Sequence, residues 1–276
     1  MAIITISREL AALGDEIASE LTKKLNYRLV DKNTLEQKIK SYGVDGAMLK
    51  KYDERKPPLW ASLSQDRDNY LHFLKTSLLA EAKLGNAVFV GRGASAIFKD
   101  IPGVLSIFLV ATPEIRIERV KSYFHCDEKK AKGIIEKSDN DRIGFHHYFF
   151  DMDWRAPENY LLTLNTGRTH PLVCTEIIKR LADYHITEET QALHEMRIKD
   201  ATLAQEIKHF ILYEKEAPVH FLDVVVSGDK IVLYGVANSQ ALVDAAMSAA
   251  IEKAMGYSSL TVISEIQVVQ EYSIVP

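Results

Sequence analysis

The chain of 276 residues lacks several features that would define its class at once. It has only two cysteines, Cys126 and Cys174, which are too few for a disulfide framework and lack the paired spacing of a zinc site. No uninterrupted apolar run approaches the roughly 18 residues of a membrane-spanning helix, and no basic flank precedes the short apolar stretch at the N-terminus. We therefore expect a cytoplasmic protein without membrane insertion.

An excess of positive charge is also lacking. The 34 basic and 38 acidic residues give a net charge of -4, which argues against a protein that coats nucleic acid. The charge is uneven, because 30 basic and 28 acidic residues precede residue 200 and 4 basic and 10 acidic residues follow from there. The two parts carry +2 and -6. This difference, and a length near twice the usual domain size of about 150 residues, indicate two domains.

The first part alternates short apolar runs with longer helical patterns, as expected for an α/β domain with a parallel sheet. Apolar residues Ile17, Leu21 and Leu25 predict a helix over residues 13–25. The polar stretch over residues 31–84 is helical in character, is interrupted by Pro57 and Pro58, and reads as a helical insertion. Strands are predicted at residues 3–7, 27–30, 87–90, 104–110 and 160–164.

A helix is predicted from Cys174 to about residue 184, and the polar, threonine-rich residues 185–192 are interpreted as a linker. Beyond it, a helix to about residue 213 precedes two strands that flank a Gly228-Asp229 turn. Glycine accepts the positive φ that tight hairpin turns require, so these strands are expected to form a hairpin. A helix over 240–255 and a strand over 260–269 complete an αββαβ unit, a small α+β fold.

The turn between the first strand and the first helix is the segment most relevant to chemistry. A loop that binds nucleotide phosphates needs glycines, a lysine, and Ser or Thr for magnesium. This segment offers one glycine and no lysine, and Asp15 and Glu16 place carboxylates at the helix N-terminus. Taken alone, these residues favour an ordinary strand-to-helix turn with acidic capping over a phosphate site. The residues considered are Ser7, Arg8, Ala11, Ala12, Leu13, Gly14, Asp15 and Glu16.

Several ordered blocks nevertheless resemble the cytidylate-kinase-like family of P-loop nucleoside monophosphate kinases, over about residues 1–185. The blocks are ITISREL, GDEIASEL, KLNYRLVDKNTLE, VFVGRGASAIFKDIPGVLSIFLVATPEIRIERV and DNDRIGFHHYFFDMDWRAPENYLLTLNT. The resemblance implies a parallel kinase sheet with helices on both faces. It also implies ATP with Mg²⁺ as phosphoryl donor, a nucleoside monophosphate as acceptor, and a lid that carries arginines.

Carried over residue by residue, the resemblance places Gly91 and Arg92 where the family grips the acceptor phosphate, with Asp31 as an acidic position nearby. Guanidinium groups suit phosphate, although a lone arginine after a strand is more often an ion-pair partner. The lid residues implied are Arg116, Arg119, Asp139 and Arg142. They would stabilise charge on the transferring group, or they form a solvated helix face.

The departures from the family lie on the donor side. Ala11 and Leu13 stand where the resemblance implies glycines, and Asp15 stands where a basic residue is usual. The ATP phosphate loop is therefore interpreted as degenerate, as in a pseudokinase. ATP and Mg²⁺ are expected only if the protein is an active kinase.

The aromatic stretch over residues 145–150, together with Trp154, is interpreted as core or interface. Adjacent histidines such as His146 and His147 point in different directions on a helix and do not share a metal, so no metal site is expected.

Residues 193–276 resemble a BON domain, on the strings VVVSGDKIVLYGVANS and AMGYSSLTVISEIQVV. The resemblance implies binding to membranes or proteins and no catalysis. The net charge of -6 disfavours docking on anionic lipid, which leaves self-association or regulation through a protein partner.

The residues leave three hypotheses open. The first is a sensor or scaffold that binds a nucleotide or another phosphorylated small molecule with weak or no catalysis. The second is an active nucleoside monophosphate kinase, and the third is a non-catalytic assembly protein. A homo-oligomer is expected, because an exposed sheet edge and an exposed aromatic stretch are both costly in water.

Overall fold

The computed structural model describes residues 2–46, 49, 66–256 and 260–269. It divides the chain into two compact units, Met1–Glu195 and Met196–Pro276. Pro57 and Pro58, which interrupt the predicted helical insertion, lie outside the described residues.

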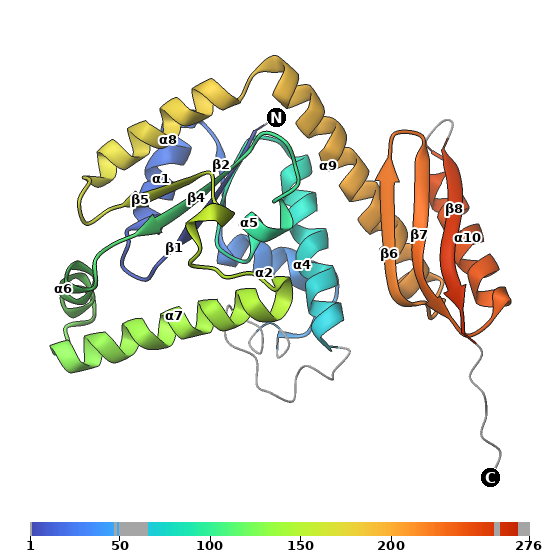
Figure 1. The fold of residues 1–276 in the computed structure, drawn as a ribbon, viewed down its shortest axis with the longest axis horizontal. Coiled ribbons are helices and arrows are strands. Elements are labelled where there is room, and N and C mark those ends of the chain that lie inside the picture. The colour runs from blue at the N-terminus through green and yellow to red at the C-terminus, as the bar shows by residue number, and fades with distance from the viewer. Residues whose placement is uncertain (1, 47–48, 50–65, 257–259, 270–276) are drawn as a thin grey trace, which may run out of the picture. The chain divides into compact units, whose positions relative to one another are not determined.

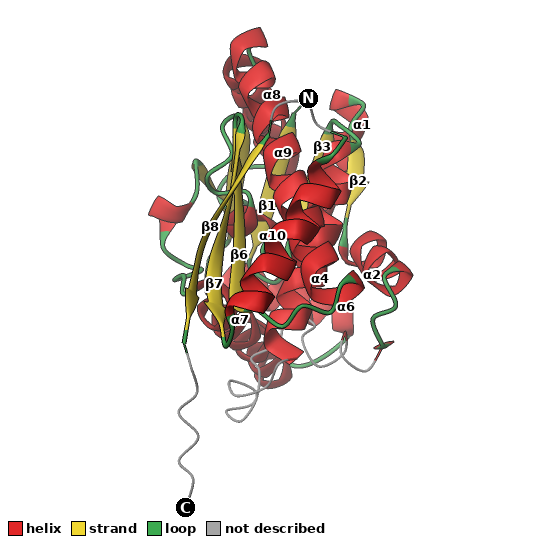
Figure 2. Cartoon of the chain, turned by 90° about the vertical axis from the view of Figure 1, so that its right-hand side faces the viewer, coloured by secondary structure: helices red, strands yellow, loops and turns green. Residues whose placement is uncertain are grey.

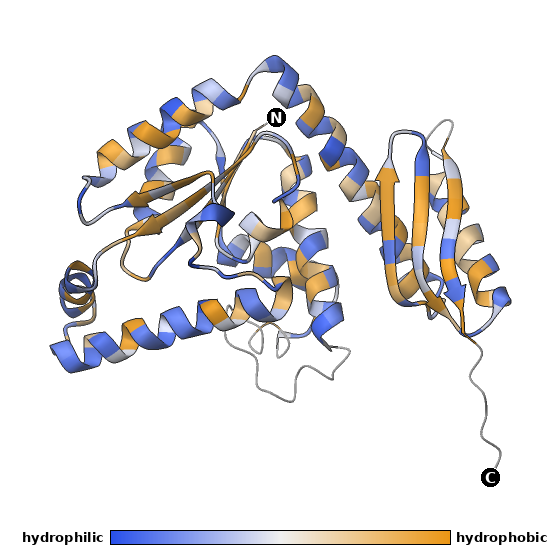
Figure 3. Ribbon diagram, in the orientation of Figure 1, coloured by the Kyte–Doolittle hydropathy of each residue, from blue (hydrophilic) through white to orange (hydrophobic). Residues whose placement is uncertain are grey.

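The first unit is built on a five-stranded parallel sheet (Figure 1). The strands lie in the order β2-β3-β1-β4-β5. Their bounds are Ile3–Arg8 for β1, Arg28–Val30 for β2, Ala87–Val90 for β3, Val104–Val110 for β4 and Leu162–Asn165 for β5. All five lie close to the strands predicted from short apolar runs, and hydrophobic residues dominate β3 and β4 (Figure 3).

Helices cover both faces of this sheet. On one face, α1 (Gly14–Leu25) and α8 (Pro171–His185) pack together over Ile4, Ile6 and Ile107. On the other face, Phe89 contacts Phe98 after the short helix α5 (Ala94–Ile97), and Phe108 stacks on Tyr160. The remaining helices of this unit are α2 (Lys32–Ser41), α4 (Asp66–Lys83), α6 (Pro113–Phe124), α7 (Glu128–Phe150) and the 3₁₀ helix η2 (Pro157–Asn159).

The predicted linker over residues 185–192 is wrong in its local structure, because helix α9 (Glu188–His209) begins inside it. Thr187 and Thr190 explain the start of the helix. The amide of Thr190 donates to Oγ1 of Thr187, and the amide of Thr187 donates to Oγ1 of Thr190. This reciprocal pair satisfies two amides at the helix start, as a capping box does. The threonines that suggested a flexible segment therefore initiate a helix, and the division between the units falls within α9.

The second unit has a three-stranded sheet in the order β6-β7-β8. Strands β6 (His220–Ser227) and β7 (Lys230–Ala237) form the predicted hairpin around Gly228, whose φ is +60°. Strand β8 (Thr261–Val268) pairs parallel with β7. Helix α10 (Gln240–Ala254) packs on one face of the sheet (Figure 2), together with the π-helical turn η3 (Phe210–Glu214) that follows α9. The predicted αββαβ order is confirmed.

Two further observations bear on the expectations from sequence. No helix in the described part of the chain is long and apolar enough to cross a membrane. Phe145, Phe149 and Trp154 are buried in the core, with at most 5% of each exposed. The aromatic stretch is therefore a core element, and it does not supply the exposed surface on which the expectation of an oligomer partly rested.

Candidate functional site

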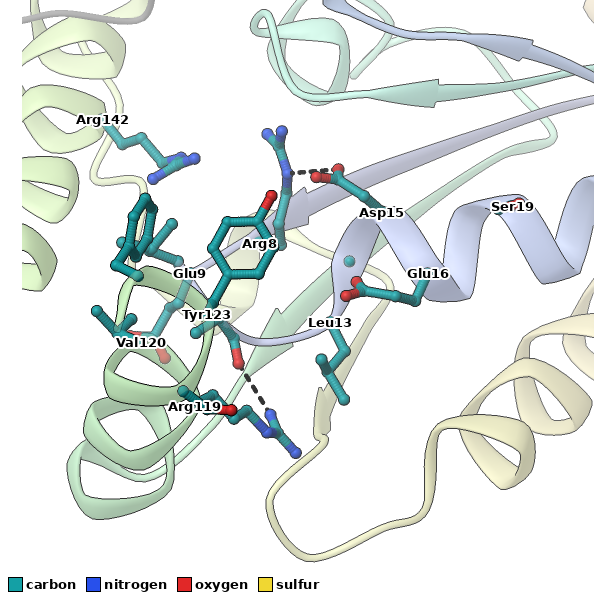
Figure 4. A pocket seen from close by; sticks show the side chains of 15 residues that line it. Arg8, Glu9, Leu13, Asp15, Glu16, Ser19, Arg119, Val120, Tyr123 and Arg142 are labelled. Carbon is teal, nitrogen blue, oxygen red and sulfur yellow. Dashed lines mark hydrogen bonds and ion pairs between the residues drawn. The ribbon is translucent and has the colours of Figure 1, made fainter. Parts of the chain in front are cut away.

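A pocket of about 810 Å³ opens where β1 ends and α1 begins (Figure 4). Its floor is the strand-to-helix turn of residues 8–16, and its walls come from the C-terminal half of α6 and from Arg142 of α7. The lining residues are Arg8, Glu9, Leu10, Ala11, Leu13, Gly14, Asp15, Glu16, Ser19, Arg119, Val120, Ser122, Tyr123, Phe124 and Arg142. The segment that sequence analysis singled out therefore faces a cavity large enough for a small-molecule ligand.

At two positions the turn has a backbone typical of glycine, although neither residue is glycine. Ala11 has φ +62° and Leu13 has φ +58°, and both values lie in the left-handed region that glycine occupies without strain. These are the two positions where the resemblance to the kinase family implied glycines. A side chain in this region costs about 1–2 kcal/mol, so the loop holds its shape against a local penalty.

Two arginines of α6 support that shape through the loop's carbonyl groups. Nε of Arg116 donates to the Leu10 carbonyl at 2.8 Å, and Nη1 of Arg119 donates to the Ala11 carbonyl at 2.9 Å. Arg119 also donates to both oxygens of Thr166, at 3.1 and 2.9 Å. Burial lowers the pKa of Arg119, and the nearby Glu16 carboxylate opposes that shift. Both guanidinium groups therefore fix the loop from its protein side.

Arg116 is also the centre of a buried charge cluster. It forms a bidentate pair with Asp139, with N-to-O distances of 3.0 and 2.7 Å, and it lies 3.2 Å from Oε1 of Glu9. Asp139 accepts a further bond from Arg155 at 2.8 Å. Arg116 and Asp139 are each 4% exposed. Of the four residues implied as lid residues, these two contact each other, whereas Arg119 and Arg142 line the pocket.

The N-terminus of α1 carries negative charge where a phosphate loop requires positive charge. Leu13 is the N-cap and makes no side-chain capping bond, while Asp15 and Glu16 occupy the first turn and stabilise the helix dipole. Asp15 lies 3.5 Å from Nε of Arg8 and is largely exposed. Three arginines and three carboxylates line the pocket, so its formal charge is zero, and no lysine is among the lining residues.

Arg142 and Tyr123 line the pocket from α7 and α6, on the side away from α1 (Figure 4). Arg142 hydrogen-bonds to Ser138, and its guanidinium carbon lies 6.0 Å from the centre of the Trp154 ring. Tyr123 is 79% exposed and packs edge-on against Phe124. Sequence analysis passed over Tyr123, because a single tyrosine on a polar helix gives no signal until the pocket is seen.

The predicted acceptor residues lie on other elements. Gly91, Arg92 and Gly93 all have left-handed φ values, between +56° and +70°, in the turn after β3. Arg92 is 4% exposed and donates to Oε1 of Glu36 on α2 at 2.9 Å. A Cβ on Gly93 would lie 2.4 Å from the Phe150 ring, so this close approach requires glycine. The alternative interpretation of Arg92 as an ion-pair partner therefore describes one of its contacts.

Asp31 has a structural role in the described contacts. Its carboxylate caps α2 by accepting from the amide and the hydroxyl of Thr34, at 2.9 and 3.0 Å. Loss of such a cap costs about 1 kcal/mol. The capping pattern was legible in the sequence, because Asp31 precedes a helical stretch and Thr34 follows three residues later.

A small hydroxyl cluster, which the sequence pattern does not predict, lies at the end of β1. Oγ of Ser7 lies 3.1 Å from Oγ of Ser95, and the Tyr160 hydroxyl donates to the carbonyl of Trp154 at 2.8 Å. Burial raises the pKa of the Tyr160 phenol, and hydrogen bonds with Ser7 and Ser95 partly oppose the rise. These residues are far apart in sequence, so only the fold brings them together. Among the described residues, no group of three or more His, Cys, Asp or Glu side chains is placed to hold a metal ion.

The parallel sheet, the strand-to-helix loop and the arginine-bearing helices define a P-loop kinase-like α/β domain. Comparison with protein families agrees, since residues 3–168 match the model of the cytidylate kinase-like family. The chain belongs to this family. Residues 199–269 match the model of the BON domain. None of the curated proteins compared with the chain matches it.

Solved structures align with about two thirds of the chain. A protein from Eubacterium ventriosum, described as uncharacterized, aligns with a TM-score of 0.53 and 22% identity, over 66% of this chain and 99% of that one. Shikimate kinase from Bacteroides thetaiotaomicron aligns with a TM-score of 0.41 and 15% identity, over 66% of this chain and 98% of that one. Shikimate kinase from Aquifex aeolicus aligns with a TM-score of 0.36 and 14% identity, over 66% of this chain and 96% of that one. At 22% identity the likeness to the Eubacterium ventriosum protein concerns the fold alone.

Proposed function

We propose that the kinase-like domain binds a nucleotide or another phosphorylated small molecule in the pocket beside the strand-to-helix loop, and that it transfers phosphoryl groups very slowly or not at all. In this proposal the protein is a sensor or scaffold located in the cytoplasm. The observation that carries it is the contrast at Ala11 and Leu13, where the loop has a left-handed, glycine-type backbone although both residues carry side chains and no lysine lines the pocket.

The retained shape supports binding. The pocket is concave, has room for a nucleotide-sized molecule, and contains Arg8, Arg119 and Arg142 on its surface. Three of the five N–H donors of Arg119 are used by Ala11 and Thr166, which leaves donors for an anionic group. Guanidinium groups recognise phosphate oxygens through paired hydrogen bonds.

The charge balance argues against efficient transfer from a magnesium nucleotide. Catalysis of phosphoryl transfer is almost entirely positioning and electrostatic stabilisation, which a lysine and a metal ion supply in this fold class. Here Asp15 and Glu16 stand at the N-terminus of α1 and line the pocket, so carboxylates occupy the helix end that would otherwise attract phosphate. The residues of the pocket therefore do not fit ATP with Mg²⁺ as a reactive pair, and we derive no catalytic step through them.

Arg92, which the family resemblance places on the acceptor side, offers a second binding point for a phosphorylated ligand. Arg92 is buried and held by Glu36, so a phosphorylated ligand there would share the guanidinium with that carboxylate. We therefore expect Glu36→Gln to strengthen binding of a phosphorylated acceptor, because it removes a competing negative charge while keeping the shape of the side chain.

Calorimetry with the full chain tests the proposal. The probes are ATP, CMP, AMP, inorganic phosphate and pyrophosphate, each with and without Mg²⁺. We expect at least one phosphorylated probe to bind, and Arg142→Gln to weaken that binding by about tenfold or more, the effect of losing a hydrogen bond to a charged group. Arg180→Gln is the matched control, because Arg180 is exposed on α8 and does not line the pocket.

The outcomes separate the three hypotheses. If no probe binds, the domain serves assembly and the proposal fails. If ATP binds and a coupled assay shows turnover near the about 1–100 per second of kinases, the protein is an active nucleoside monophosphate kinase. Binding that depends on Arg142 without turnover supports the sensor.

A further inference from the structure

Strand β8 leaves one of its edges without a strand partner in the described part of the chain. Its pairing with β7 uses the odd-numbered residues, because the amide of Thr261 donates to the carbonyl of Asp229 and the amide of Val269 donates to that of Ala237. The even-numbered residues therefore direct their backbone groups away from β7. Within the described contacts, the only outward amide with a partner is that of Ile266, which lies 3.3 Å from Oγ of Ser264.

Strand β6 forms the other edge of the same sheet, and its irregular backbone hinders pairing with a further strand. Strand β6 carries an irregularity between His220 and Asp223, and Phe221 inside it has φ +53°. Bulges of this kind bend an edge strand away from further pairing. Strand β8 keeps one register with β7 over all its eight residues, contains neither proline nor lysine, and carries a single charge at Glu265. It lacks the devices that keep an edge strand from pairing.

We propose that β8 pairs antiparallel with β8 of a second copy of this chain, with Ser264 of each copy on the twofold axis. The two sheets then continue into one sheet of six strands. The outward amide and carbonyl of Val262 bond to those of Ile266 in the second copy, where they replace the long contact between the Ile266 amide and Oγ of Ser264. The backbone groups of the two Ser264 residues bond to each other, which gives about six hydrogen bonds across the axis.

The side chains of β8 select this register. On the face covered by α10, Val262 of one copy lies opposite Ile266 of the other, so each cross-strand pair consists of two apolar side chains. On the open face, Ile263 lies opposite Glu265, and no like charges meet. Moving the axis from Ser264 to Glu265 would place the two Glu265 carboxylates directly opposite each other, which destabilises the pair. Registers displaced further pair fewer residues of the strand.

The surface charge limits the strength of this dimer. The C-terminal part carries a net charge of -6 in each copy, so long-range repulsion opposes association. Pairing through one strand also buries little surface. We therefore expect a dissociation constant in the range of about 1–100 µM, and self-association that strengthens as salt screens the repulsion.

Analytical ultracentrifugation of the full chain tests the dimer and its location. Ile263→Glu places two pairs of like charges across the proposed axis and should raise the dissociation constant by about tenfold or more. Val225→Glu is the matched control. Val225 lies in the same cross-strand row as Ile263, through Val232, and has a similar exposure, but it lies on β6 and not at the proposed interface. It should leave the dissociation constant unchanged.

Cysteine cross-linking tests the register in the otherwise unchanged chain. Under mild oxidation Ser264→Cys should give a covalent dimer, because residues opposite each other at the axis lie within disulfide reach. Glu265→Cys should not, and the parent chain reports any cross-link through Cys126. A chain that stays monomeric up to about 200 µM overturns the proposal. So does a dimer that resists Ile263→Glu or that cross-links through Glu265→Cys in preference to Ser264→Cys.

Discussion

The left-handed backbone at Ala11 predicts an unusual result, because replacing this alanine by glycine should stabilise the protein. A left-handed residue with a side chain costs about 1–2 kcal/mol relative to glycine. Glycine in turn loses about 0.5–1 kcal/mol through the greater freedom of the unfolded chain. The methyl group of Ala11 is only partly buried, so little packing is lost. The expected gain in the free energy of unfolding is about 0.5–1 kcal/mol.

Ala12 is the matched control. It is the next residue, and its replacement by glycine should lower the free energy of unfolding. It is not among the left-handed residues of the described chain, and it is fully buried against α1 and the sheet. Ala12→Gly therefore loses about 0.8 kcal/mol for its methyl group and about 0.5–1 kcal/mol of backbone entropy. The two variants should differ by about 2 kcal/mol, or roughly 4–8 °C in Tm for a domain of this size.

Urea unfolding followed by tryptophan fluorescence isolates the relevant domain. Trp60 and Trp154 are the only tryptophans, and both precede the boundary between the two units. The midpoint should rise for Ala11→Gly and fall for Ala12→Gly, with an unchanged dependence on urea. Equal destabilisation by both changes would refute the reasoning, because it would mean that Ala11 bears no conformational penalty.

Further predictions follow from the site and from the domain boundary. Turnover with any nucleoside monophosphate should stay far below the about 1–100 per second of kinases, and Leu13→Gly alone should not restore it in a coupled assay, since Asp15 and Glu16 remain. Asp139→Asn should cost about 3–5 kcal/mol in urea unfolding because it breaks the buried pair with Arg116. Glu118→Gln, at an exposed pair with Lys121, should leave the unfolding midpoint nearly unchanged. Residues 193–276, expressed alone, should unfold cooperatively by circular dichroism, because the second unit has its own core. Burial lowers the pKa of His194, so stability should fall as the pH drops from about 6.5 through that lowered pKa, and His194→Gln should flatten this part of the profile.

The strands and the charge boundary could be predicted because they depend on local composition. Buried parallel strands are short and apolar, and the hairpin at Gly228 needs a residue that accepts a positive φ. The start of α9 could not be predicted in the same way, because the threonines at 187 and 190 cap a helix only when their backbone already turns. Polar composition alone does not distinguish a cap from a linker.

In the candidate site, too, local features could be predicted from the sequence and contacts between distant residues could not. The sequence located the loop and the arginines that surround it, since these are close in sequence or carried by the resemblance. It could not assign partners across the fold, such as Glu9 and Asp139 on Arg116, or Glu36 on Arg92. A guanidinium group has the same signature in a sequence whether it faces a ligand or a buried carboxylate. Only the positions of these acidic residues in space separate the two roles.

The contacts of the loop explain how it holds a left-handed backbone at Ala11 and Leu13, two residues that carry side chains. In a phosphate loop the backbone is held open for a ligand, and glycine makes that conformation inexpensive. Here Arg116 and Arg119 bind the carbonyls of Leu10 and Ala11 from the protein side, and the Arg116–Asp139 pair anchors that contact in α7. The surrounding structure thus compensates for a penalty of about 1–2 kcal/mol at each left-handed residue. Contacts from α6, anchored in α7 through Asp139, therefore hold the loop in this shape beside Asp15 and Glu16.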